Sequence, residues 1–310
     1  MEPEKEVVLP RLARKRKHEE IAAYKKILIA VFFLLCAGLG FMAQRYFADP
    51  LIPVAIAGES PTQYAAEDIL NLLLIGVDQR ESEPSRADTI ILASIDLTEK
   101  KINLLSLPRD TRVKIAGTNE LRKINYSHTI GGAELTVETV EDFLGLPVHY
   151  YIETNFDGFE GIIDILGGIT LNVEQRMYYP EEEIDLYAGL QKLAGHDALS
   201  YVRWRSDGRG DIGRIERQQK FFRALVDQAV SFSTIWKLPD LTGELSKHLQ
   251  TDMSLQKMII LANKLKDIQN VQLETAMVPG TPDDINYGAS YWIADTEALT
   301  EILKGIYGEQ

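Results

Sequence analysis

Three nearly continuous apolar runs constrain the fold of this chain more than any other feature. They are ILNLLLIGVD at residues 69–78, TIILASID at residues 89–96 and KINLLSLPRD at residues 101–110. A strand that faces water on one side alternates apolar and polar residues, whereas these runs show almost no alternation. We therefore expect three strands buried on both faces, as in a sheet that helices cover on its two sides.

Segments with helical and strand patterns alternate along the rest of the chain. One predicted helix, residues 131–145, has an apolar side formed by Leu135, Val137, Val140, Phe143 and Leu144. Further helices are predicted at residues 156–166, 211–230, 255–266 and 295–306, a helix or turn at 196–205, and further strands at 149–156, 167–175 and 271–279. This alternation indicates an α/β sandwich, and since no linker-like stretch divides it, we expect one domain over residues 67–310.

The N-terminal region has the pattern of a membrane anchor. A basic segment precedes ILIAVFFLLCAGLGFMA, residues 27–43, which carries no charge. A span needs about 17–25 such residues, and a basic flank stays in the cytoplasm. We predict a cytoplasmic tail at 1–26, a single transmembrane helix at 27–46 and a stalk at 47–66, which leaves the rest extracytoplasmic. A cleaved signal peptide fits less well, because its apolar region would be about 7–15 residues long and GFMAQ is a poor cleavage site.

The charge distribution excludes one class of partner. The chain carries −13 and residues 1–26 carry +3, so the remainder stands at −16. Such an acidic body is poorly suited to nucleic acid. The only cysteine, Cys36, lies in the predicted span, so the outer domain has no disulfide and no cysteine nucleophile.

Five arginines nevertheless gather in YVRWRSDGRGDIGRIERQQKFF, residues 201–222: Arg203, Arg205, Arg209, Arg214 and Arg217. A solvated helix face with local ion pairs is the simplest explanation. However, Arg203 and Arg205 are spaced to point the same way on an extended segment, and Arg214 and Gln218 are one helical turn apart.

Further charged pairs stand where the predicted strands begin or end: Asp78 and Arg80, Arg86 and Asp88, and Arg109 and Asp110. Ligands of α/β sheets bind in the crevice at strand ends. Each pair taken alone is as well explained by a turn, a cap or a surface ion pair. Taken together, arginines match phosphate oxygens, and the carboxylates of Asp78 and Asp88 suit Mg²⁺ bridging to phosphate. Asn125 and Tyr126 of KINYSHTIGG either line the same crevice or belong to a plain loop.

The order of these motifs resembles the LytR–CpsA–Psr family over residues 68–285. The segments are LLLIGVDQR, SRADTIIL, LLSLPRDT, KINYSH, HYYIETNFDGFEGIIDILGGITLNV, GHDALSYVRWRSDGRGDIGRIERQQ and VPG. The family's K-x-N-x-A-Y block reads KINYSH here, so Tyr126 and Ser127 replace what the pattern leads one to expect.

The resemblance implies a three-layer α/β/α sandwich with a mixed sheet and an apolar tunnel for a polyprenyl chain. It implies an extracytoplasmic enzyme, in an envelope of the Gram-positive type, that uses Mg²⁺, with Mn²⁺ as a substitute. The reaction would move an anionic glycopolymer, such as teichoic acid, from a polyprenyl-pyrophosphate carrier to peptidoglycan through a phosphodiester bond.

By motif match, the metal would lie at Asp78 and Asp88. The pyrophosphate would lie at Arg80, Arg86, Arg109, Arg203, Arg205, Arg214 and Gln218, with polar support from Asp211 and Asn125. Asp88, Arg109, Arg203 and Arg205 would be the catalytic set. We expect the tunnel lining on helices around 135–144, 156–166 and 221–230. A hydrolase of the same lipid-linked substrate and a non-catalytic envelope scaffold or regulator are the alternatives.

Overall fold

The computed structural model describes residues 69–78, 85–205, 210–229, 249–266, 272–283 and 290–308. The chain divides into two compact units, Met1–Pro50 and Leu51–Gln310, and all of these residues belong to the second. The predicted tail, anchor and stalk lie outside them. Among the described helices, none has the length and apolar character needed to cross a bilayer.

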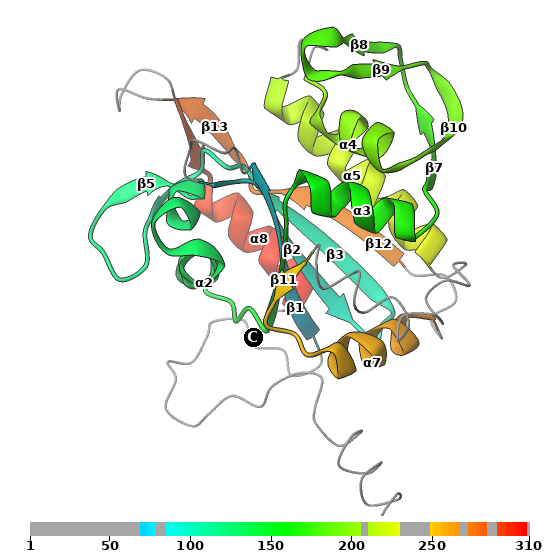
Figure 1. The fold of residues 1–310 in the computed structure, drawn as a ribbon. Coiled ribbons are helices and arrows are strands. Elements are labelled where there is room, and N and C mark those ends of the chain that lie inside the picture. Colours follow the sequence, from blue (N-terminus) through cyan, green and yellow to red (C-terminus); the bar gives the residue numbers. More distant parts are fainter. Residues whose placement is uncertain are drawn as a thin grey trace, which may run out of the picture. The chain divides into compact units, whose positions relative to one another are not determined.

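A six-stranded mixed sheet forms the centre of this unit, in the order β11-β6-β1-β2-β3-β12 (Figure 1). Its strands are β1 (Ile69–Asp78), β2 (Arg86–Asp96), β3 (Lys101–Leu107), β6 (Tyr150–Thr154), β11 (Gln250–Thr251) and β12 (Gln272–Met277). The three apolar runs pair as an antiparallel meander, β1 with β2 and β2 with β3. The sheet then grows by parallel pairing of β6 with β1 and of β12 with β3.

Helices cover both faces of the sheet, which confirms the expectation from the uniformly apolar strands. Side chains that alternate along a strand enter two different cores. Leu73, Ile75 and Leu92 pack on one face with α2 (Asn125–Leu144) and α8 (Thr296–Tyr307). Leu72, Ile91 and Leu104 pack on the other face with α7 (Leu255–Lys266) and α5 (Gly210–Ala229).

A second packed region lies beside the sheet and shares α5 with it (Figure 1). It contains α3 (Phe156–Ile165), α4 (Gly195–Arg203), the pair β7 (Ile169–Val173) and β10 (Gly189–Leu193), and the pair β8 (Met177–Tyr179) and β9 (Ile184–Leu186). The short 3-10 helix η1 (Pro180–Glu182) joins β8 to β9. Its core includes Ile163, Leu171, Leu199, Trp204 and Phe221.

Two short hairpins and a kinked helix complete the unit. The hairpins are β4 (Arg112–Lys114) with β5 (Leu121–Lys123), and β13 (Gly280–Asp283) with β14 (Tyr291–Ala294). The helix predicted at 131–145 begins earlier, at Asn125, so the KINYSH segment is not the plain loop that its composition allowed. Gly132 interrupts the helical dihedrals with φ 68°, a conformation that glycine adopts without steric cost, and α2 continues beyond this kink.

Candidate functional site

A cavity of about 430 Å³ lies between the central sheet and the helices α3, α4 and α5. Its apolar wall is built mainly from the inner sides of α3 and α5 together with β1 and β6. The residues are Leu74, Ile75, Ile152, Phe156, Phe159, Ile162, Ile163, Leu199, Val202, Phe221, Phe222 and Leu225. Such a wall accepts hydrocarbon and offers few hydrogen-bond partners.

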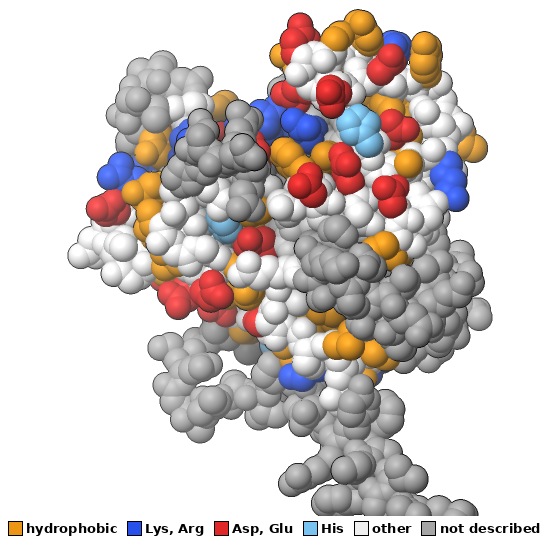
Figure 2. All heavy atoms as spheres, viewed as in Figure 1, with side chains coloured by type: hydrophobic (Ala, Val, Ile, Leu, Met, Phe, Trp, Pro, Cys, Tyr) orange, Lys and Arg blue, Asp and Glu red, His pale blue; other side chains and the backbone are white. Residues whose placement is uncertain are grey.

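Polar side chains line another part of the same cavity and include most of the predicted site. They are Asp78, Asp88, Thr89, Arg109, Glu182, Arg203, Arg205, Arg214 and Gln218. The structure thus brings together seven of the predicted side chains, which are contributed by β1, β2, the turn after β3, α4, the segment directly after α4 and α5. Figure 2 shows Lys and Arg side chains gathered in the hollow between the α2–β5 side of the molecule and the α3–α4 side.

A second cavity of about 610 Å³ adjoins the first and shares Asp78, Asp88 and Arg109 with it. Its other walls come from the β4–β5 hairpin, the first turns of α2 and β14. They contribute Arg122, Lys123, Asn125, Tyr126, Thr129 and Tyr291, while Arg86 comes from the start of β2 and Asp110 from the turn after β3. Two further predicted residues, Arg86 and Asn125, therefore lie here and do not line the apolar cavity.

A register shift in the β1–β2 pair places the two aspartates. Gly76 lies opposite Thr89 while Val77 lies opposite Ala87, so the pairing passes over Asp88. A bulge of this kind redirects a side chain out of the regular alternation. Consequently the neighbours Asp88 and Thr89 both line the apolar cavity, whereas a regular strand would send them to opposite faces.

Ion pairs fix the carboxylates near the shared wall. The Nη1 atom of Arg109 donates to Oδ2 of Asp88 at 2.9 Å, and Lys123 Nζ lies 2.7 Å from Oδ1 of Asp110. Asp78 and Asp88 suit Mg²⁺, which needs only one or two carboxylates when phosphate oxygens and water complete its shell. Within the described ranges, no three His, Cys, Asp or Glu side chains come together as a candidate metal cluster. A metal at these two carboxylates would need phosphate oxygens and water for its remaining ligands.

The arginine-rich stretch divides into site residues and a structural residue. Arg203 ends α4, its guanidinium lies 4.5 Å from the Phe156 ring centre, and its Nη2 lies 3.2 Å from Oε2 of Glu182. Arg214 and Gln218 lie one turn apart on α5, and Gln218 donates to the Thr89 hydroxyl at 3.1 Å.

Arg217 has a different role, since its side chain is buried, donates to the Trp204 carbonyl and lies over the Trp204 ring at 4.9 Å. Arg80 and Arg209 lie outside the described residues, as does the side chain of Asp211.

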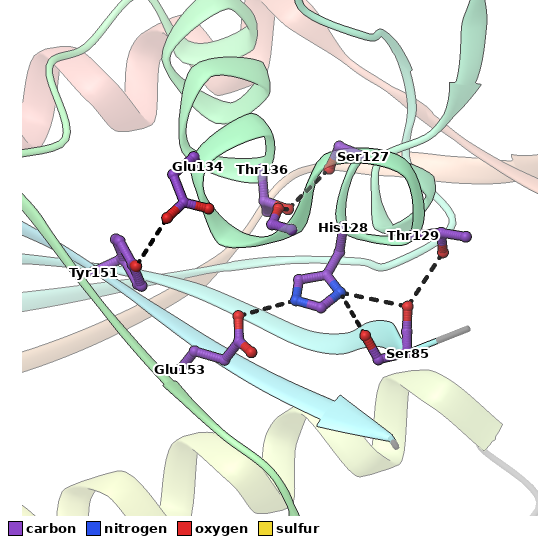
Figure 3. A network of polar contacts seen from close by, with 9 residues as sticks. Ser85, Ser127, His128, Thr129, Glu134, Thr136, Tyr151 and Glu153 are labelled. Carbon is purple, nitrogen blue, oxygen red and sulfur yellow. Dashed lines mark hydrogen bonds and ion pairs between the residues drawn. The ribbon is translucent and has the colours of Figure 1, made fainter. Parts of the chain in front are cut away.

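A buried polar network connects α2 and β6 with the residue that precedes β2 (Figure 3). Nε2 of His128, on the first turn of α2, lies 2.9 Å from Oε2 of Glu153 on β6. Nδ1 of His128 lies 3.3 Å from the hydroxyl and 3.4 Å from the carbonyl oxygen of Ser85, the residue before Arg86. Burial lowers the pKa of His128, but Glu153, the Ser85 carbonyl and the charge of Glu134 together outweigh it, so the pKa is raised.

One expectation about the cavity lining is wrong. Residues 135–144 were predicted to line the apolar cavity, but α2 packs on the opposite face of the sheet with α8. The sequence also gave no sign of Thr89, Glu182 or Tyr291 as site residues. Thr89 stands at the start of an apolar strand run, and the other two stand in short elements remote in sequence from the charged motifs. An acidic residue near an arginine cluster is a common surface feature, so no local signal distinguishes Glu182.

Comparison with known proteins shows to which family the chain belongs. The LytR_cpsA_psr family model matches residues 52–306, which is most of the chain. The chain belongs to the LytR_cpsA_psr family. Two relatives bear the name polyisoprenyl-teichoic acid–peptidoglycan teichoic acid transferase TagU. The relative from Oceanobacillus iheyensis is 36% identical, over 79% of this chain and 77% of its own. The relative from Bacillus subtilis is 34% identical, over 77% of each.

Solved structures of similar proteins share the fold. The crystal structure of TagV from B. subtilis superimposes with a TM-score of 0.69 at 30% identity, covering 78% of this chain and 97% of its own. A structure described as TagT bound to LIIa-WTA superimposes with a TM-score of 0.68 at 28% identity, covering 83% of this chain and all of its own. The mixed sheet between helices is thus the LytR_cpsA_psr architecture.

Proposed function

We propose that this protein transfers an anionic glycopolymer, teichoic acid or one like it, from a polyprenyl-pyrophosphate carrier to peptidoglycan. The observation that carries the proposal is the cavity itself. Its wall is hydrocarbon over much of α3 and α5, and it also carries aspartates and Arg109 from the strand ends and arginines from the end of α4 and the start of α5. An amphiphile with a pyrophosphate head and an isoprenoid tail has that same division. The names of the two relatives support this substrate class.

The apolar part of the cavity would hold the isoprenoid next to the pyrophosphate. Phe159, Phe221 and Leu225 offer only carbon surface there. Each buried methylene of a lipid stabilises binding by about 0.8 kcal/mol, so a few isoprene units suffice to anchor the donor. The tunnel expected for the lipid corresponds in this proposal to the cavity between α3 and α5.

The charged part would hold the pyrophosphate. Arg203, Arg205 and Arg214 approach from α4 and α5, and Arg109 approaches from the turn after β3. Planar guanidinium groups bind phosphate oxygens two at a time and stabilise the charge that moves to the leaving phosphate. Asp78 and Asp88 would hold Mg²⁺, or Mn²⁺ in its place. A metal held there would supply neutralisation of the negative charge of the pyrophosphate.

The reaction is a displacement at the phosphorus nearer the sugar. A hydroxyl oxygen of the acceptor glycan forms a bond to that phosphorus, and the bond from phosphorus to the bridging oxygen breaks. Polyprenyl phosphate leaves with the bond electrons, and the hydroxyl proton passes to the Asp88 carboxylate and then to water. Arg109, whose Nη1 donates to Oδ2 of Asp88 at 2.9 Å, orients that carboxylate.

This proposal places the enzyme on the outer face of the cell membrane. The charge-free segment 27–43 would anchor it, with the basic residues 1–26 in the cytoplasm. Substrate and acceptor both belong to the envelope, so a membrane-tethered domain would meet its lipid-linked donor at the bilayer surface.

The test uses the full chain in detergent micelles with a synthetic polyprenyl-pyrophosphate disaccharide, uncross-linked glycan strands and Mg²⁺. We expect the wild type to transfer label to glycan. The rate of this transfer should fall by about a hundredfold or more with Asp88→Asn and with Arg203→Ala. Arg223→Ala, an exposed arginine on the same helix as Arg214 but outside both cavities, is the control. Release of saccharide phosphate into water without attachment would identify a hydrolase. Tight donor binding without either product would leave a scaffold.

A further inference from the structure

The second cavity has a chemistry unlike that of the first. Its walls are charged and aromatic, and they carry two tyrosines, Tyr126 on the first turn of α2 and Tyr291 at the start of β14. Tyr126 is 39% exposed. Arg122 lies 5.8 Å from the centre of the Tyr126 ring, and Lys123 lies 5.8 Å from the centre of the Tyr291 ring.

This combination suits a sugar. The apolar face of a pyranose ring stacks on an aromatic side chain, and its hydroxyls bond to planar polar groups placed around it. Asn125 offers both a donor and an acceptor, and Arg122 and Lys123 offer donors. The volume of about 610 Å³ falls in the range of ligand pockets and exceeds that of the first, apolar cavity.

The position of this cavity relative to the first fits one role in the proposed reaction. The two cavities share Asp78, Asp88 and Arg109, and their other walls come from α3, α4 and α5 in the first and from α2, β5 and β14 in the second. In phosphoryl transfer the attacking and leaving oxygens stand in line through the phosphorus. If the leaving polyprenyl phosphate lies toward the apolar cavity, the nucleophile approaches from the opposite side.

We propose that the cavity lined by Tyr126 and Tyr291 is the acceptor subsite, which binds a sugar of the peptidoglycan glycan strand and presents its hydroxyl at Asp88. This inference rests on the proposed function and adds the location of its second substrate. The sugar of the donor would lie to the side, because its oxygen is an equatorial substituent of the phosphorus in an in-line displacement. The KINYSH segment thereby acquires a role as the acceptor-binding turn of α2.

The first test measures binding and does not depend on turnover. Fluorescently labelled, uncross-linked glycan strands are titrated with the full chain in detergent micelles, and anisotropy gives the affinity. We expect Tyr126→Ala to weaken binding about fivefold to tenfold, and Tyr126→Phe, which keeps the ring, to remain within about twofold of wild type. The control is Tyr187→Ala, a tyrosine that is 68% exposed and lines neither cavity. Equal affinity for all four proteins would overturn the subsite.

The second test separates the two substrates by kinetics. With Tyr126→Ala and with Tyr291→Ala we expect the KM for glycan strands to rise about fivefold to tenfold while the KM for the lipid-linked donor is unchanged. A rise in the donor KM alone would assign the cavity to the donor's own sugar and contradict the proposal. If the wild type transfers nothing yet glycan binding depends on Tyr126, the transferase proposal fails and the glycan site stands.

Discussion

At the scale of single residues, Arg203 in the first cavity already has an anionic partner. The Glu182 carboxylate lies 3.2 Å from the Arg203 guanidinium, so in the proposed reaction the pyrophosphate of the donor would replace one anion by another. Both side chains are partly exposed, and exposed pairs of this kind contribute about 0.2–1 kcal/mol. Glu182 is therefore a weak internal substitute for the substrate.

Removal of that carboxylate should favour the donor. We expect Glu182→Gln to lower the KM for the polyprenyl-pyrophosphate donor by about twofold to fivefold with little change in kcat, as measured by initial rates. Glu183→Gln removes one negative charge from the exposed neighbouring residue and is the matched control. A higher donor KM in Glu182→Gln would instead show that Glu182 contacts the substrate favourably.

His128 links stability to pH. The pKa of His128 is raised above its ordinary value, because Glu153 and the Ser85 carbonyl favour the charged ring more than burial disfavours it. Glu134 adds to this effect from α2. A group whose pKa is raised by folding stabilises the fold below its unfolded pKa of about 6.5, and this contribution is lost as pH rises through the folded value.

Glu153→Gln should therefore destabilise the protein in a pH-dependent way. We expect a loss of about 1–2 kcal/mol in the free energy of unfolding near pH 6, shrinking toward pH 9, where the imidazole is neutral in both proteins. Urea unfolding at the two pH values measures it, with the exposed Glu138→Gln on α2 as control. A penalty that grew with pH would contradict the assigned sign.

At the scale of elements, α3 and α4 approach so closely that one position must be glycine. A Cβ at Gly195 would collide with the backbone of Glu160, and the Gly195 amide donates to the Asp164 carboxylate at 2.7 Å. These contacts set the spacing of the two helices whose side chains line the lipid cavity.

We expect Gly195→Ala to lower the free energy of unfolding by about 1–3 kcal/mol, because the helices must separate to accept the methyl group. Gly305→Ala is the counterpart on α8, where a Cβ meets no atom of the structure within contact range. There the gain in helix propensity should stabilise by up to about 1 kcal/mol. Thermal unfolding of both variants is the measurement, and equal effects would refute the packing argument.

The elements also show where sequence reasoning works and where it stops. The apolar runs of β1, β2 and β3 were predictable, since burial on both faces leaves a signature in composition alone. The bulge at Asp88 was not, because it arises from the pairing of two strands and no residue of either encodes it locally. The short hairpins, such as β13 with β14, bury too few side chains to produce a pattern.

At the scale of the whole sheet-and-helix unit, the charged motifs at the strand ends lie close together, as the sequence predicts. Their division between two cavities does not follow from the sequence. Arg86 and Arg109 stand in similar motifs, yet Arg86 lines only the aromatic cavity while Arg109 lines both. The face covered by α2 could not be assigned either, since amphipathicity shows that a helix packs and not on which side of the sheet.

The last prediction concerns the first cavity, where the central sheet meets the helices α3, α4 and α5. Ile162 on α3 lines it, and Ile165 on the same helix does not. We expect Ile162→Trp to fill part of the space and raise the KM of a long-chain donor about tenfold or more, since displacing two buried methylenes is enough for that loss. A donor with a short isoprenyl tail should change by about twofold at most. Ile165→Trp controls for the added bulk, and unchanged thermal unfolding shows that the fold is kept. An equal rise in KM for both donors would place the isoprenoid elsewhere on the protein.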